Sequence, residues 1–254
     1  MEQKIRIAAH LALMVAAPAL MGALAQPRDR VELRGGGGAY RFVPACGSRA
    51  VQVRHVDAAV RLHNRHGPLA FVGGDVVTDL DGVMATETRK DAESFTDQGT
   101  GNTRLLDSDV TYAFARAIVG IDWAWAGLRL GGVGGGRFSR NELGVLDREF
   151  RAFPAWALRL GPEWIHARWS LGAGDWDTRP SAMTFALGWG IAEDVDDHEP
   201  RIRGVIGFTQ DVFDNNAGYF LLGARTRVET FEIGLQGRAG PDGSAGTLYF
   251  GLPL

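Results

Sequence analysis

The stretch SAMTFALGWGI, residues 181–191, alternates large apolar residues with small ones over nearly its whole length. The large residues would share one face of an extended chain: Met183, Phe185, Leu187, Trp189 and Ile191. The positions between them hold only alanine, threonine and glycine. A period of two predicts a β-strand, because successive side chains of a strand point to opposite faces, whereas a helix has a period of 3.6.

The same alternation recurs in EWIHARWSLGA (163–173), TFEIGLQGR (230–238) and, more weakly, AWAGLRLGG (124–132). In each segment one face is bulky and apolar, and the other mixes small residues with arginine, histidine, glutamate or glutamine. A β-sandwich could bury the bulky face against a second sheet. An outer-membrane barrel could turn that face to lipid and line a polar lumen with the other. Periodicity alone leaves both architectures open.

The length of the strand-like segments and the order of their connections favour the barrel. The segments lie at 51–63, 68–80, 109–121, 124–136, 150–160, 164–174, 181–191, 200–210, 217–226, 228–238 and 244–254. Their lengths suit the 9 to 11 residues or so that a tilted strand needs to cross a bilayer. Short turns, expected at 64–67, 122–123, 161–163 and 227, alternate with mostly longer connections at 81–108, 137–149, 175–180, 211–216 and 239–243. Outer-membrane barrels show this alternation of short periplasmic turns and longer external loops. The connection at 193–199 is the exception, since it is long but falls on the side of the short turns.

With the C-terminus in the periplasm, this alternation requires one more strand, for which 37–43 is the candidate. The prediction is therefore an all-β, closed, antiparallel up-and-down transmembrane β-barrel of about twelve strands, with ten as the alternative count. Closure would pair the last strand with the first and leave no exposed edge.

The final residues, GTLYFGLPL (246–254), place Leu248, Phe250, Leu252 and Leu254 on one face. This ending resembles the last strand of Gram-negative outer-membrane β-barrel proteins as a class. The resemblance covers about residues 36–254 and rests on pattern rather than on a family motif. It implies location in the outer membrane, contact with outer-membrane lipid, and recognition of the last strand by the barrel-assembly machinery.

The N-terminus predicts export. Lys4 and Arg6 precede an apolar run that ends in Ala23-Leu24-Ala25, which is typical of a secretory signal peptide cleaved before Gln26. An uncleaved anchor helix is the alternative. The expected organisation is a signal peptide at 1–25, a short segment at 26–35 and the barrel at 36–254.

Polar residues on the face opposite the apolar one are the candidates for the barrel interior. We expect these residues to line the lumen: His55, Asp57, Arg61, His63, Arg129, Arg159, His166, Arg168, Glu232, Gln236 and Arg238. Within VRHVDAAVRLH (53–63), the two histidines and the aspartate between them could also form a catalytic or metal site, because alternate residues of a strand lie about 6.5–7 Å apart. The simpler interpretation is a network of ion pairs that fills the bore.

The composition and motifs predict no nucleic-acid partner, no cofactor and no metal ligand set. The net charge is −3, which gives no electrostatic case for binding nucleic acid. The acidic run EDVDDHEP (193–200) lacks the glycine and terminal glutamate of an EF-hand and is expected to be a solvated turn.

We therefore expect a barrel without enzymatic activity that acts as a narrow channel, a scaffold or an accessory surface protein. Its small-solute or protein partner is left open. One alternative is an outer-membrane hydrolase or acyltransferase that acts on lipid or peptide through His166 or His55. A second alternative is a secreted, soluble β-sandwich that binds sugar or protein.

Overall fold

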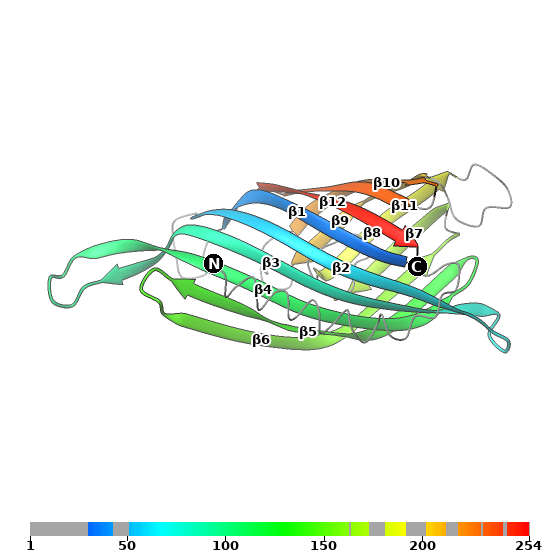
Figure 1. Cartoon of the computed structure of the whole chain (residues 1–254), viewed down its shortest axis with the longest axis horizontal. Helices are drawn as coiled ribbons and strands as arrows, with labels where there is room; N and C mark the ends of the chain where they lie inside the picture. The colour runs from blue at the N-terminus through cyan, green and yellow to red at the C-terminus, as the bar shows by residue number, and fades with distance from the viewer. Residues whose placement is uncertain are drawn as a thin grey trace.

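The computed structural model describes residues 30–42, 51–162, 164–172, 181–191, 202–211, 218–229, 231–240 and 243–253. They form twelve strands, each antiparallel to its neighbours, and the sheet closes on itself (Figure 1). The strands are β1 Arg30–Phe42, β2 Val51–Leu69, β3 Gly74–Thr96, β4 Thr103–Asp122, β5 Ala126–Asn141, β6 Leu146–Leu160, β7 Ile165–Leu171, β8 Ser181–Ile191, β9 Ile202–Asp211, β10 Gly218–Val228, β11 Phe231–Gly240 and β12 Gly243–Pro253. Among the described residues there is no helix of the length and apolar character needed to cross a membrane.

The barrel closes through the pairing of β1 with β12, which runs from Arg30 opposite Pro253 to Tyr40 opposite Gly243. The apolar last strand therefore has a partner on both sides, β1 and β11. The predicted fold class, a closed antiparallel barrel with about twelve strands, is confirmed. Neither edge of the sheet is left to pair with another chain.

The two faces of the wall differ as a transmembrane barrel requires. Phe185 and Trp189 on β8 are 39% and 40% exposed, and Leu235 on β11 is 62% exposed. The polar residues that alternate with Leu235 are buried in the bore, and Gln236 is 2% exposed. Because the bulky face points outward rather than into a dry space between two sheets, the β-sandwich alternative is wrong. An apolar outer band around a polar interior is the arrangement of a transmembrane barrel.

Several expected strand ends need correction. The expected turn at 64–67 is a bulge between Arg65 and Gly67, and β2 continues through it to Leu69. Gly67 has a φ of 82°, so the glycine serves the bulge rather than a turn. The turn itself spans 70–73. Likewise β1 begins at Arg30, six residues before the expected start of the barrel at 36, because the charged residues of this segment point inward and find ion-pair partners.

The expected long connections at 81–108 and 137–149 are mostly strand. β3 and β4 continue as a two-stranded ribbon to a turn at 97–102, and β5 and β6 meet at a turn at 142–145. We call residues 90–107 the arm, because in this stretch β3 and β4 pair only with each other (Figure 1). Apart from Leu106 at its base, which is 2% exposed, the arm is mostly exposed on both faces, so its sequence needs no apolar alternation and did not indicate a strand. The expected connections at 175–180 and 211–216 lie almost entirely outside the described residues.

The interior is layered along the barrel axis. We call the end at which Arg30 pairs with Pro253 the terminal end, and the end that bears the arm the arm end. Towards the arm end, buried apolar side chains meet in the bore: Ala85, Val110, Tyr112, Phe114 and Val133, with Phe153 packed against them. Towards the terminal end, the interior is charged. Buried ionic groups also reach the arm end, where Glu87 is fully buried and accepts a hydrogen bond from Tyr112.

Candidate functional site: an arginine-lined cavity

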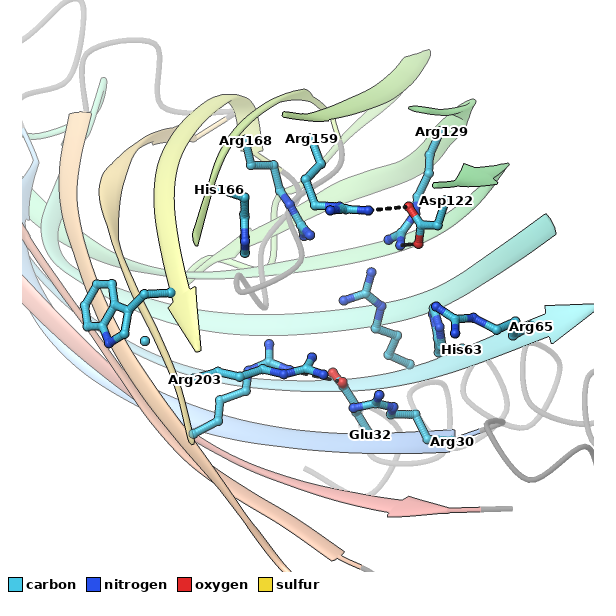
Figure 2. A pocket seen from close by; sticks show the side chains of 14 residues that line it. Arg30, Glu32, His63, Arg65, Asp122, Arg129, Arg159, His166, Arg168 and Arg203 are labelled. Carbon is cyan, nitrogen blue, oxygen red and sulfur yellow. Dashed lines mark hydrogen bonds and ion pairs between the residues drawn. The ribbon is translucent and has the colours of Figure 1, made fainter. Parts of the chain in front are cut away.

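A cavity that is partly open to solvent lies inside the terminal end of the barrel (Figure 2). Of the 14 described residues that line it, eight are arginines and two are histidines, whereas only Glu32 and Asp122 are acidic. A guanidinium group stays charged at any physiological pH. The wall of this cavity is therefore strongly positive.

Strand register places some of these arginines directly opposite one another. Arg159 on β6 is the cross-strand partner of Arg168 on β7, and Arg203 on β9 is the partner of Arg225 on β10. Cβ atoms of such pairs lie about 4.5–5.5 Å apart, and like charges in this position are destabilising. All four side chains line the same cavity. Repulsion between these neighbouring arginines therefore destabilises the terminal end of the barrel.

One carboxylate, Asp79 on β3, contacts three of the surrounding basic side chains. Its oxygens lie 3.0 Å from an Arg61 nitrogen, 2.8 Å from an Arg129 nitrogen and 2.5 Å from His63 Nδ1. The Asp79 side chain is fully buried. Arg129 also contacts Asp122 at 2.7 Å. Arg61 and Arg129 are thus held by carboxylates and keep fixed positions in the wall.

A second group of ion pairs lies on the adjacent part of the wall, where Glu32 on β1 is the cross-strand partner of Arg61 on β2. Glu32 contacts Arg34 at 2.6 Å and Arg225 at 3.2 Å. Glu232 contacts Arg30 at 2.7 Å and Arg225 at 3.7 Å. These pairs fix Arg30 and Arg225 as Asp79 fixes Arg61 and Arg129.

The side chain of Arg159 is held by main-chain carbonyls rather than chiefly by an acid. It donates hydrogen bonds to the carbonyl oxygens of Gly161, Trp123 and Ala126 at 2.5, 2.8 and 3.0 Å. Its nearest Asp122 oxygen is farther away, at 3.8 Å. These bonds tie β6 to the turn between β4 and β5, so Arg159 closes the terminal end of the wall while it lines the cavity.

The structure places all eleven residues expected to line the lumen on the inward face of their strands. Six of them line the cavity itself: Arg61, His63, Arg129, Arg159, His166 and Arg168. Glu232 adjoins it through Arg30 and Arg225. His55, Asp57, Gln236 and Arg238 lie deeper, where an Asp57 oxygen is 4.0 Å from His55 Nε2 and 3.8 Å from an Arg238 nitrogen.

The two histidines of segment 53–63 therefore do not form one cluster. His55 approaches Asp57, whereas His63 bonds to Asp79 on the neighbouring strand. No group of three or more histidine, cysteine or carboxylate side chains in the described part of the chain has the arrangement of a metal site. His166 packs over Gly188 of β8, and Ser170 is buried farther along β7. The acidic run 193–200 lies outside the described residues.

The sequence interpretation missed several residues of the site. Glu32 lies in the segment assigned ahead of the barrel, and Asp122 in an expected turn. Asp79, Arg203 and Arg225 lie in strands that were predicted. Steps of two from Leu80, Ile202 and Leu222 mark the outward apolar face, so these three residues fall on the opposite, inward face. That signal was available in the sequence. The sequence does not show which residues on other strands they contact, because those contacts depend on the register between strands.

The sequence matches no protein-family model, and no curated protein matches it significantly. Three solved structures resemble the fold over most of its length. The translocator domain of the autotransporter NalP from Neisseria meningitidis has a TM-score of 0.38 and 9% identity, covering 100% of this chain and 98% of that one. The attachment invasion locus protein Ail of Yersinia pestis, in complex with the heparin analogue sucrose octasulfate, has a TM-score of 0.25 and 12% identity, covering 88% and 95%.

OccK7 of Pseudomonas aeruginosa has a TM-score of 0.25 and 10% identity, covering 89% of this chain and 99% of that one. The closed pairing of the twelve strands and the two contrasting faces of the wall agree with the resemblance to Gram-negative outer-membrane β-barrels that the sequence shows.

Proposed function

We propose that this protein is a non-enzymatic barrel of the outer membrane that acts as a narrow channel for small anions. In this proposal the terminal end faces the periplasm and the arm end faces outward, since short turns are typical of the periplasmic side. Residues 1–25 are proposed to be a cleaved signal peptide, and they lie outside the described residues. Outer-membrane lipid and the barrel-assembly machinery are its proposed partners.

Aromatic residues at the terminal end support a membrane interface there. Trp125 and Trp164 lie in neighbouring turns, are 68% and 58% exposed, and meet edge to face with ring centroids 6.4 Å apart. Amphipathic aromatic rings collect at the level of lipid headgroups. Phe71, in the turn between β2 and β3, is 84% exposed at the same end. Such side chains are costly in water and favourable at the edge of a bilayer.

The arginine-lined cavity is the observation that carries the proposal. Asp79 and Glu232 hold four of the lining arginines, which offsets part of the cost of burying like charges together. Arginines still outnumber carboxylates eight to two among the described lining residues, and this excess makes the cavity attractive to anions. A twelve-stranded barrel is also wider than the eight-stranded type that side chains just fill and narrower than open sixteen-stranded porins. A bore of this width suits slow, charge-selective passage of small ions.

The test is the current carried by purified full-length protein in a planar lipid bilayer under a potassium chloride gradient. We expect small conductance steps and a reversal potential whose sign shows that chloride passes more readily than potassium. Arg203→Gln should shift the reversal potential towards zero. Arg54→Gln, which changes an exposed arginine on the outer face of β2, should leave it unchanged. A folded protein that carries no current, or that prefers potassium, would overturn the proposal.

The arm favours a second candidate function, a surface scaffold. Residues 90–107 extend beyond the neighbouring strands and expose Phe95 and Leu105 at 37% and 43%. Deletion of residues 93–104 separates the two functions. A channel should keep its conductance without the arm, whereas a scaffold should lose its binding to whole cells or matrix proteins.

A further inference from the structure

We propose that the cavity at the terminal end is a binding site for a small multivalent oxyanion of the phosphate type. The inference rests on the proposed function in taking the solute to be an anion. It goes beyond that function by naming the chemical class of the anion and the residues that select it.

The arrangement of the arginines indicates that the bound anion carries more than one negative charge. Arg159 on β6 and Arg168 on β7 are cross-strand neighbours that line the cavity (Figure 2). Arg203 on β9 and Arg225 on β10 form a second such pair. A chloride ion in the cavity offsets a single charge, whereas a phosphate or pyrophosphate ion offsets two or more. The cavity therefore favours multivalent ions over chloride.

The hydrogen-bonding chemistry favours oxygen acceptors in particular. Each guanidinium presents five N–H donors in a planar fork that matches the oxygens of phosphate. The chain contains only two lysines, Lys4 and Lys90, and neither lines the cavity. Positive charge at this mouth is thus supplied entirely by the side chain that forms directed, bidentate contacts.

The rigidity of the site suits a bound ion. Asp79 holds Arg61 and Arg129, and three main-chain carbonyls hold Arg159. Because these side chains are fixed before the ion arrives, little conformational entropy is lost when it binds. The carboxylates thus fix the positions of these arginines in the wall.

The experiment is isothermal titration of the purified full-length protein in detergent with inorganic phosphate, pyrophosphate or chloride at matched ionic strength. We expect pyrophosphate to bind at least tenfold more tightly than phosphate, and chloride to give no saturable heat. The double substitution Arg168→Gln with Arg203→Gln should weaken pyrophosphate binding at least tenfold, which corresponds to about 1.4 kcal/mol. Arg151→Gln is the matched control, since this inward arginine lies towards the arm end and contacts Glu149 at 2.7 Å.

Faster migration on gels of unheated than of boiled samples shows that each variant is folded. Pyrophosphate and chloride that cannot be told apart, or a folded double variant that binds as well as the parent, would overturn the inference. The two proposals fail separately. A barrel that binds pyrophosphate without conducting refutes the channel, whereas one that conducts chloride without binding pyrophosphate refutes the oxyanion site.

Discussion

Arg129 on β5 reaches past β4 and contacts Asp79 on β3, with an N–O distance of 2.8 Å. The pair therefore joins two strands that share no backbone hydrogen bonds. Arg61 approaches the same carboxylate from β2 at 3.0 Å, so Asp79 connects β2, β3 and β5 through side chains. Three strands of the wall are braced from inside by one buried acid.

Replacing Asp79 should therefore destabilise the barrel strongly. Asp79→Asn leaves Arg61, Arg129 and His63 without their shared carboxylate, and removing one partner of a buried ion pair costs about 3–5 kcal/mol. The measurement is urea unfolding in lipid vesicles, followed by tryptophan fluorescence. Asp147→Asn is the control, because Asp147 is 65% exposed where it contacts Arg137 and such a surface pair contributes about 0–1 kcal/mol. Equal losses for the two variants would contradict the bracing role of Asp79.

The outward face gives a second prediction. Leu235 lies midway along β11 and is 62% exposed, so Leu235→Arg places a charge near the middle of the bilayer. We expect a loss of about 2–4 kcal/mol in the free energy of unfolding from lipid vesicles. Phe71→Arg, in a turn at the edge of the membrane, should cost only about 0–1 kcal/mol. In a protein whose outer face met water, both substitutions would be nearly neutral.

The sequence predicted which face of a strand each side chain occupies, but it did not predict which residues on other strands that side chain contacts. Alternation at 181–191 predicted both the bounds of β8 and the outward direction of Phe185 and Trp189, because the period of a strand sets its faces. The arm was missed because a ribbon in water carries no apolar face. The cavity was missed because the opposition of Arg159 to Arg168 depends on the register between two strands, and neither segment contains that information alone.

Gly234 gives a third prediction, on how the interior is packed. A Cβ atom at Gly234 would overlap the ring of Tyr249, which lies beneath the Arg225 guanidinium at 4.3 Å from the ring centroid. Gly234→Ala should therefore displace the ring and cost about 1–3 kcal/mol, as overpacking does. On the same strand, Gly237 faces outward with its nearest neighbouring atom 3.9 Å from a Cβ, so Gly237→Ala should be tolerated.

A double-substitution cycle isolates the cause of the Gly234 effect. In a background with Tyr249→Ala, Gly234→Ala should cost much less than it does alone, because the ring that it displaces is gone. Urea unfolding of the four proteins measures the coupling. An undiminished cost in that background would locate the strain in the backbone instead.

The fourth prediction concerns pH and the tip of the arm. Main-chain N–H groups of Gly99 and Thr100 donate to an Asp97 oxygen at 2.7 and 3.4 Å, and these bonds lower the pKa of the Asp97 carboxyl below its usual value of 3.8. Because the folded pKa is the depressed one, the stabilisation of the turn is present at neutral pH and is lost as the pH falls through that lowered pKa. The amide of Gly99, followed by NMR in detergent micelles, should titrate with a midpoint below 3.8. In Asp97→Asn this titration should disappear, since the amide side chain does not ionise, while the unfolding of the barrel stays unchanged. A midpoint at or above the usual value would mean that these main-chain bonds do not form in solution.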